Sequence, residues 1–371
     1  LQSVLREALT GYAETHRLSP RQWQVCAHIL GCRTSALGGL QMQCDHCHAS
    51  STLYHACRDR HCPRCQRQAS EAWCTRQRDN VLPVTYHHLV FTLPHDLNPW
   101  IEWAPRLCYR LLFETVWATL SAFAADPKRL DGQLGMTAVL HTWGQNLSRH
   151  VHLHCLVPVG ALSAAGDWHS AKSNYLFPVR ALSRHFRGGF VSRLRQALGR
   201  EECKGLDTPR QYQAMLDTLM SSEWVVYSKP CLTRTVTVVD YLGRYSHRIA
   251  LTDGRLLPLE GNQVALRYKD YRMGGKPKIM QLSHEELIRR FLLHVLPKGF
   301  TRIRHYGFLA NRCRVQRLEQ VRAAITTRPA ISSAEINDAT IDSFEGYPCP
   351  QCHQGQLRVI AQLEPKRFEG G

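Results

Sequence analysis

The feature that most constrains this chain is an apolar run in which histidine occupies every second position, His150-Val151-His152-Leu153-His154. Side chains of a β-strand alternate between faces, so the three histidines of such a strand share one face. Neighbouring histidines on that face have Cα atoms about 7 Å apart, close enough for two imidazoles to bind one ion, whereas three along a straight strand cannot all reach it. The pattern predicts one histidine pair completed by a ligand from elsewhere. A half-buried strand whose histidines only form hydrogen bonds is the alternative.

Composition indicates a globular, nucleic-acid-binding protein. The 371 residues are 44% hydrophobic, enough for two or three domains with a real core. Lysine and arginine exceed aspartate and glutamate by 17, which favours a polyanionic partner, most simply nucleic acid. We expect neither a membrane span nor a signal peptide, because no uncharged apolar run approaches the required length of about 18 residues.

Fifteen cysteines indicate metal binding in a reducing cytoplasm rather than disulfides, because several form C-x-x-C pairs beside basic residues. Cys44/Cys47 and Cys62/Cys65 are separated by 14 residues, close to the spacing of a four-cysteine structural zinc site. We predict that these four cysteines bind one zinc ion.

Other nearby ligand-type residues leave alternatives open. Cys57 or His61 could replace one ligand, and Cys26, His28 and Cys32 could assist a second site, although simple packing is favoured for these three. A further C-x-x-C pair, Cys349/Cys352, has no second pair after it, so either it shares a metal ion with ligands from elsewhere in the chain or it binds no metal. We call each C-x-x-C pair a knuckle.

Basic residues near the knuckles and in the C-terminal third are expected to contact DNA. A basic zinc module is most simply a DNA-docking module, and a basic stretch interleaved with Tyr306 and Phe308 suits base stacking and phosphate contact. The predicted DNA-binding residues are Arg58, Arg60, Arg64, Lys276, Lys278, Arg302, Arg304 and Arg312.

Apolar periodicity predicts a mixed succession of elements. Helices are expected over residues 1–18, 20–30, 100–124, 180–221 and 283–295, the last opened by the capping box Ser283/Glu286. Strands are expected over 88–94, 136–145, 150–157, 233–239 and 264–268, and a linker over 326–345.

Tyr241 and Tyr245 are four residues apart, so a helix capped by Asp240 would present both phenols on one face, although Gly243 weakens that helix by about 1 kcal/mol. Packing of the two rings on the core is the alternative. Together with a metal site and a large positive charge, they suggest phosphodiester cleavage by a tyrosine nucleophile. The ion would neutralise charge that develops on the phosphate, and a nearby cation or base would help to deprotonate the phenol.

Several motifs of this chain resemble the HUH endonucleases and, more closely, the two-tyrosine rolling-circle transposases of the insertion sequence ninety-one type. They are Cys57-Arg58-Asp59-Arg60-His61-Cys62-Pro63-Arg64-Cys65, His152-Leu153-His154-Cys155, Tyr241-Leu242-Gly243-Arg244-Tyr245-Ser246-His247-Arg248 and residues 289–300. The resemblance covers nearly the whole chain.

The resemblance implies an α+β fold, with an HUH core of antiparallel sheet flanked by helices, an N-terminal zinc domain and a basic C-terminal region. The expected domains are residues 1–82, 83–255 and 256–371, the second containing helical insertions.

The resemblance also assigns the nuclease site. His152 and His154 are implied as the metal pair and Tyr241 and Tyr245 as the nucleophiles, while His150/His152 is a second possible pair. For the third ligand we favour Gln145 over His141. The ion is expected to be Mg²⁺ or Mn²⁺, because it must engage phosphate oxygens and exchange.

The implied activity is that of a bacterial cytoplasmic, nucleoid-associated transposase. It would nick and rejoin single-stranded DNA at insertion-sequence ends, including hairpins, through a 5′-phosphotyrosine intermediate. A plasmid replication initiator or relaxase would use the same chemistry, but the zinc module and the absence of helicase motifs argue against it. A zinc-dependent DNA-binding regulator without nuclease activity is the alternative from another functional class. The sequence leaves open the recognised DNA sequences, the order of the two tyrosines and the oligomeric state.

Overall fold

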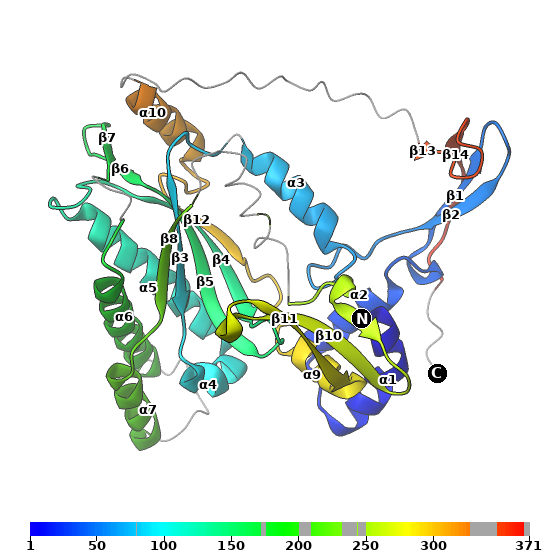
Figure 1. Ribbon diagram of the computed structural model, residues 1–371, viewed down its shortest axis with the longest axis horizontal. Coiled ribbons are helices and arrows are strands. Elements are labelled where there is room, and N and C mark those ends of the chain that lie inside the picture. Colours follow the sequence, from blue (N-terminus) through cyan, green and yellow to red (C-terminus); the bar gives the residue numbers. More distant parts are fainter. Residues whose placement is uncertain are drawn as a thin grey trace. The chain divides into compact units, whose positions relative to one another are not determined.

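A computed structural model describes residues 1–78, 80–171, 176–199, 209–231, 243, 250–326 and 347–366 (Figure 1). Tyr241, Tyr245, the strand expected over 233–239 and almost all of the expected linker lie outside these residues. The chain divides into two compact units, Leu1–Gln66 with Ala330–Gly371, and Arg67–Pro329. This division differs from the three consecutive domains expected, because a C-terminal strand pairs with an N-terminal one.

The first unit combines two helices with a small antiparallel sheet. Helix α2 (Pro20–Gly31) begins as expected at Ser19, whose side chain and that of Gln22 form a reciprocal capping box. The sheet has the order β13-β14-β1-β2, and the pairing of β14 with β1 brings Leu357 opposite Cys44. The remaining elements of this unit are α1 (Gln2–Thr15), η1 (Ser35–Leu37), β1 (Gly39–Cys44), β2 (Ser50–Tyr54), β13 (Tyr347–Pro348) and β14 (Gln356–Leu363).

The second unit is built on a five-stranded, wholly antiparallel sheet of order β12-β4-β5-β3-β8. The histidine strand therefore lies at its centre. The strands are β3 (Tyr86–Thr92), β4 (Gly135–Trp143), β5 (Arg149–Pro158), β8 (Val226–Cys231) and β12 (Ile303–Gly307). The strands expected at 88–94, 136–145 and 150–157 are present, with ends shifted by a few residues.

The two faces of this sheet differ in chemistry. Leu89, Phe91, Leu153 and Cys155 point into the main hydrophobic core, which α5 (Pro105–Ala125) and α6 (Val179–Gly199) complete on that face (Figure 1). The alternate residues of the same strands point to the opposite face and include the histidines of β5.

The second unit contains further helices and a second, smaller sheet. A separate three-stranded sheet has the order β11-β10-β9. Helix α9 begins at the expected capping residue Ser283, whose Oγ accepts a hydrogen bond from Glu286 N, but it ends at Leu292 instead of residue 295. The other elements are α3 (Gln66–Arg78), η2 (His95–Leu97), α4 (Asn98–Trp103), β6 (Gly160–Leu162), β7 (Trp168–Ser170), α7 (Pro209–Ser221), η3 (Asp253–Arg255), β9 (Leu256–Pro258), β10 (Gln263–Asp270), η4 (Tyr271–Met273), β11 (Lys276–Ser283), α9 (His284–Leu292) and α10 (Arg314–Thr326).

Within the part of the chain that the structure describes, every helix is too short or too polar to cross a lipid bilayer.

Candidate functional site

Three histidines converge at the centre of the five-stranded sheet. His141 of β4 lies directly opposite His152 of β5, and His154 follows two residues later on the same face. One ring nitrogen from each residue lies within 4.8 Å of the other two, and the Nε2 atoms of His152 and His154 are 3.1 Å apart. The structure thus brings the expected pair together and adds a third imidazole from the adjacent strand.

His141, not the favoured Gln145, occupies the third position. Strand β4 ends at Trp143, and its register with β5 shifts after His141, so Gln145 lies in the turn beyond the strand. The backbone carbonyl of Gln145 accepts a hydrogen bond from Arg255 Nη2. The preference for Gln145 assumed that the strand alternation continued for two residues more than it does.

Hydrogen bonds orient two of the three rings. His152 Nδ1 lies 2.8 Å from the backbone carbonyl of His150, which can only accept, so Nδ1 carries the proton and Nε2 keeps its lone pair. His154 Nδ1 lies 2.8 Å from His88 Nε2, which leaves His154 Nε2 facing His152. Such outer partners are characteristic of histidines that bind metal.

Burial keeps these imidazoles neutral. It lowers the pKa of His152 to about 3 and that of His154 well below its usual value, and neighbouring histidines contribute to both shifts. Burial also lowers the pKa of His88 to about 4. The neutral imidazole is the form that binds a metal ion, so His152 and His154 have the protonation state of metal ligands at pH 7.

Sequence reasoning missed His88. It belongs to an expected strand, but its place beside His154 depends on the pairing of β3 with β5, in which Val90 lies opposite His154. Histidine in a largely apolar stretch was the only signal in the sequence.

The two tyrosines lie outside the described residues, but Gly243, which stands between them in the sequence, is described. Its carbonyl accepts a hydrogen bond of 2.9 Å from Ser70 Oγ of α3. A β-carbon at Gly243 would overlap Cys74 Sγ, one turn further along α3, so glycine permits the close approach.

The four cysteines assigned to one zinc site fall into two different clusters, so that assignment is wrong. Each C-x-x-C pair meets two cysteines whose role the sequence leaves open, because strand pairing and helix packing decide which thiols meet. Cys62 and Cys65 join Cys32 and Cys57, whereas Cys44 and Cys47 join Cys349 and Cys352.

Both clusters have the dimensions of tetrahedral zinc. Four thiolates about 2.3 Å from a zinc ion are about 3.8 Å apart. Sulfur separations are 3.6 Å for Cys32–Cys65 and 3.7 Å for Cys57–Cys65 in the first tetrad. They are 3.7 Å for both Cys44–Cys352 and Cys47–Cys349 in the second.

His61 and His28 support the first tetrad and are not its ligands. The buried His61 places Nδ1 2.8 Å from Asp59 Oδ1, and His28 places Nδ1 2.9 Å from Asp59 Oδ2. Although burial opposes ionisation, hydrogen bonds from these groups hold the pKa of Asp59 well below its usual range. A charged Asp59 therefore fixes the loop between Cys57 and Cys62.

The predicted DNA-binding residues separate into exposed and structural groups. Arg302 is only 7% exposed, and the Arg304 guanidinium lies 4.2 Å from the centre of the Phe113 ring. Phe308, expected to stack on bases, is fully buried. Lys278 forms an ion pair with Asp270 at 2.7 Å. The exposed members of the set are Arg58, Arg60, Arg64, Lys276, Lys278 and Arg312.

Comparisons with known proteins identify the family. A family model described as "Transposase zinc-binding domain" matches residues 4–93, and one described as "Putative transposase" matches residues 135–317. The chain is 43% identical over 368 residues to the "Putative transposase y4qJ" of Sinorhizobium fredii, which covers 94% of this chain and 92% of that protein.

A second relative is the transposase of a named insertion sequence. The chain is 28% identical over 312 residues, 80% of its own length and 72% of the relative's, to the transposase for insertion sequence element IS801 of Pseudomonas savastanoi. No solved structure matches the chain. With a zinc-binding domain whose cysteines form two tetrads, followed by a transposase domain that contains the histidine cluster, this chain belongs to the IS91 family of transposases.

Proposed function

We propose that this transposase nicks and rejoins single-stranded DNA at insertion-sequence ends by tyrosine attack at a metal-assisted HUH site. The observation that carries the proposal is the convergence of three imidazoles on one point of the sheet, where His152 directs its Nε2 lone pair toward His154. His141, His152 and His154 would hold one divalent cation. Three protein ligands leave positions for phosphate oxygens.

The three imidazole nitrogens influence which divalent cation the site prefers. Imidazole nitrogens suit Mn²⁺ better than Mg²⁺, whose protein ligands are mainly oxygens. When bound, the cation supplies Lewis-acid stabilisation of the phosphate charge that grows during cleavage. We therefore expect Mn²⁺ to support cleavage at lower concentration than Mg²⁺.

Tyr241 and Tyr245 are the proposed nucleophiles. A phenol gives up its proton, its oxygen attacks phosphorus, and the bond to the 3′ oxygen breaks, so that the 3′ hydroxyl leaves with a proton and a 5′-phosphotyrosine remains. The reverse reaction with another 3′ hydroxyl rejoins the strand. The Ser70–Gly243 hydrogen bond supports the assignment, because it anchors the residue between the two tyrosines to α3 in the same unit as the histidines.

The test is covalent adduct formation. The protein is incubated with labelled single-stranded DNA that carries an element end, with Mn²⁺, Mg²⁺ or EDTA, and resolved on a denaturing gel. We expect a metal-dependent adduct whose phosphopeptide maps by mass spectrometry to Tyr241 or Tyr245, and no adduct from a variant that lacks both phenols. DNA binding without an adduct in either metal would instead favour the zinc-dependent DNA-binding regulator.

His88 is expected to position a metal ligand. His88→Leu removes the ring nitrogen that lies 2.8 Å from His154 Nδ1, and loss of such an outer partner typically weakens metal binding about 10- to 100-fold. The Mn²⁺ concentration for half-maximal cleavage should rise by that factor, with partial recovery in His88→Gln, whose amide oxygen can accept the same hydrogen bond.

His87→Leu is the matched control for this prediction. His87 is an adjacent buried histidine, and its side chain pairs with Ser228 on the other side of the strand. The positioning role is refuted if the Mn²⁺ dependence of His88→Leu equals that of the unaltered protein.

A further inference from the structure

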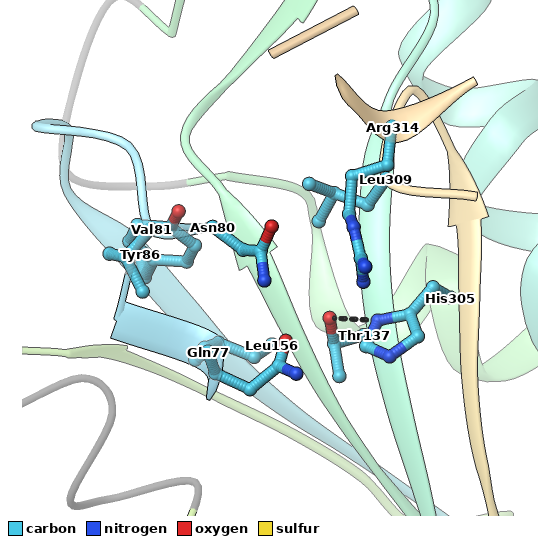
Figure 2. A pocket seen from close by; sticks show the side chains of 9 residues that line it. All are labelled: Gln77, Asn80, Val81, Tyr86, Thr137, Leu156, His305, Leu309 and Arg314. Carbon is cyan, nitrogen blue, oxygen red and sulfur yellow. Dashed lines mark hydrogen bonds between the residues drawn. The ribbon is translucent and has the colours of Figure 1, made fainter. Parts of the chain in front are cut away.

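The hollow on the histidine-bearing face of the five-stranded sheet is too small for a nucleotide. Its volume is about 20 Å³, room for roughly one water molecule, and its walls include Gln77, Thr137, Leu156 and Arg314 (Figure 2). Within it, His305 Nδ1 lies 3.0 Å from Thr137 Oγ1. The hollow can therefore hold water but no part of a DNA strand, whereas an exposed hairpin of the same unit offers an open surface.

This hairpin is a two-stranded ribbon that extends beyond the small sheet of the second unit. Strand β9 pairs with Val264–Leu266 of β10, and beyond this point β10 continues with β11 alone. Leu282 is buried at the root, whereas the described side chains of residues 267–279 are exposed or half-buried. At the far end, Gly275 N donates a hydrogen bond of 2.8 Å to the carbonyl of Asp270. We call residues 267–279 the β10–β11 ribbon.

Both faces of the β10–β11 ribbon carry cations. Residues that pair across two strands share a face, so Arg267 and Lys269 lie on one face and Lys276 and Lys278 on the other. All four are exposed. Asp270, the one acidic residue in this sequence, pairs with Lys278 at 2.7 Å. Each face therefore keeps a net positive charge.

Large apolar side chains are exposed at the tip of the ribbon. Tyr271 is 70% exposed and Met273 is 54% exposed, and Ile279 of β11 is 62% exposed. Exposed apolar groups that lie together beside charged residues are typical of a surface that binds a partner. The expected partner has negative charge along its sides and an apolar component between them.

The major groove of duplex DNA has this chemistry and the matching dimensions. It is about 12 Å wide and 8.5 Å deep, it admits a two-stranded β-ribbon, and thymine methyl groups lie on its floor. The four residue pairs of the ribbon before its turn extend about 10 Å, so the tip can reach the floor. Cations on the two faces then approach the phosphates of both DNA strands. A single strand has one phosphate backbone, so it would leave the cations of one face unpaired.

Two arginines join the root of the ribbon to the sheet that carries the histidines. Arg255 Nε donates to the carbonyl of Arg267 at 2.9 Å, and its Nη2 donates to the carbonyl of Gln145. Arg290 of α9 donates to the carbonyl of Asn146 at 2.8 Å, and α9 packs against β11. Gln145 and Asn146 belong to the turn that directly follows β4, the strand of His141. A duplex on the ribbon would therefore lie beside the histidine cluster.

We infer that the β10–β11 ribbon binds the major groove of a base-paired DNA stem that adjoins the cleaved single strand. The place of this stem beside a cleavage site rests on the proposed nuclease function, whereas binding of duplex DNA by the ribbon can be tested separately. Lys276 and Lys278 were expected to contact DNA, and the two-faced arrangement adds which form of DNA they contact.

The test is fluorescence anisotropy without added Mg²⁺ or Mn²⁺ and without a chelator, so that the structural zinc remains bound. The probes are a DNA hairpin with a stem of about 12 base pairs, just over one helical turn, and a thymidine single strand of about 12 nucleotides. Affinities are measured between about 50 and 200 mM salt.

Lys269→Gln and Lys276→Gln each remove one cation, from opposite faces of the ribbon. Each should lower the slope of log affinity against log salt for the hairpin probe by about 0.9, the value for one lost phosphate contact. Tyr271→Ser should weaken hairpin binding about ten-fold at every salt concentration and leave the slope unchanged, because it removes an apolar contact. Binding of the thymidine strand should stay the same in all three variants.

Lys128→Gln is the matched control, because it removes one exposed lysine from the same unit. Lys128 lies before the first residue of β4, whereas the ribbon is joined to the turn beyond its last residue. This variant should bind the hairpin probe with an unchanged salt slope. An equal change in slope in Lys128→Gln would show a general effect of charge and overturn the inference.

Three other results would also overturn it. They are failure of the unaltered protein to bind the hairpin probe, a change in slope for a cation on one face alone, and an equal loss of binding to the thymidine strand. Covalent adduct formation is scored separately. An adduct with unchanged hairpin binding in the ribbon variants would leave the nuclease and remove the duplex site, whereas ribbon-dependent hairpin binding without an adduct would do the opposite.

Discussion

His152→Ala and His154→Ala are each expected to reduce the rate of DNA cleavage by about three orders of magnitude. Each substitution removes one of three imidazoles within 4.8 Å of one another, and two remaining ligands hold a divalent ion weakly. Metal stabilisation of phosphate charge contributes several kcal/mol, and about 1.4 kcal/mol corresponds to a factor of ten in rate. The measurement is the single-turnover rate of adduct formation at saturating Mn²⁺.

His150→Ala is the matched control, and it also decides between the two histidine pairs that the sequence left open. His150 belongs to the same strand, but its imidazole is not one of the three that converge, and the substitution retains its backbone carbonyl, which accepts the hydrogen bond from His152 Nδ1. The variant should cleave at nearly the normal rate. A large loss in His150→Ala with normal cleavage by His154→Ala would move the metal site to His150 and His152. Thermal unfolding of all three variants checks that none has lost its fold.

Cys352→Ser is expected to halve the zinc content of the protein and to unfold the sheet of the first unit. Four-thiolate zinc sites contribute about 10–16 kcal/mol of apparent free energy in small domains, which equals or exceeds the whole stability of a typical domain. This site joins the knuckle after β1 to the knuckle before β14, and few other contacts could replace it in so small a sheet. Zinc bound per chain, measured by atomic emission, should fall from two ions to one.

Cys313→Ser serves as the control because Cys313 lies outside both tetrads. It should retain two zinc ions and the normal unfolding curve. The single-site arrangement of Cys44, Cys47, Cys62 and Cys65 predicts the contrary result, one zinc ion in the unaltered protein and no change in Cys352→Ser. Zinc content alone therefore distinguishes the two arrangements.

Local features of the fold could be predicted because they depend on near neighbours in sequence. The Ser19/Gln22 capping box starts α2, Ser283 starts α9, and the alternation of β5 places His152 and His154 on one face. The family was recognised from motifs of the same kind, and the comparisons confirm it.

Features that depend on distant pairing could not be predicted in the same way. The tetrads require the register of β14 on β1 and the packing of Cys32 at the end of α2, and neither leaves a local pattern. Similarly, His88 reaches His154 only because β3 is the neighbour of β5. Arg302 and Arg304 resemble exposed cations in sequence, but one is buried and the other stacks on Phe113.

The second tetrad also controls the order in which the newly made chain can mature. Cys44 and Cys352 are 308 residues apart, and Cys47 and Cys349 are 302 apart. At about 5–20 residues per second, a ribosome that has made the first knuckle needs roughly 15 to 60 s to make the second. During that interval the thiols of Cys44 and Cys47 lack the other two thiols of their tetrad, and the edge of β1 that pairs with β14 is unpaired. The first unit can therefore be completed only after the second unit has been synthesised, so premature termination within the second unit yields a chain in which neither unit is complete.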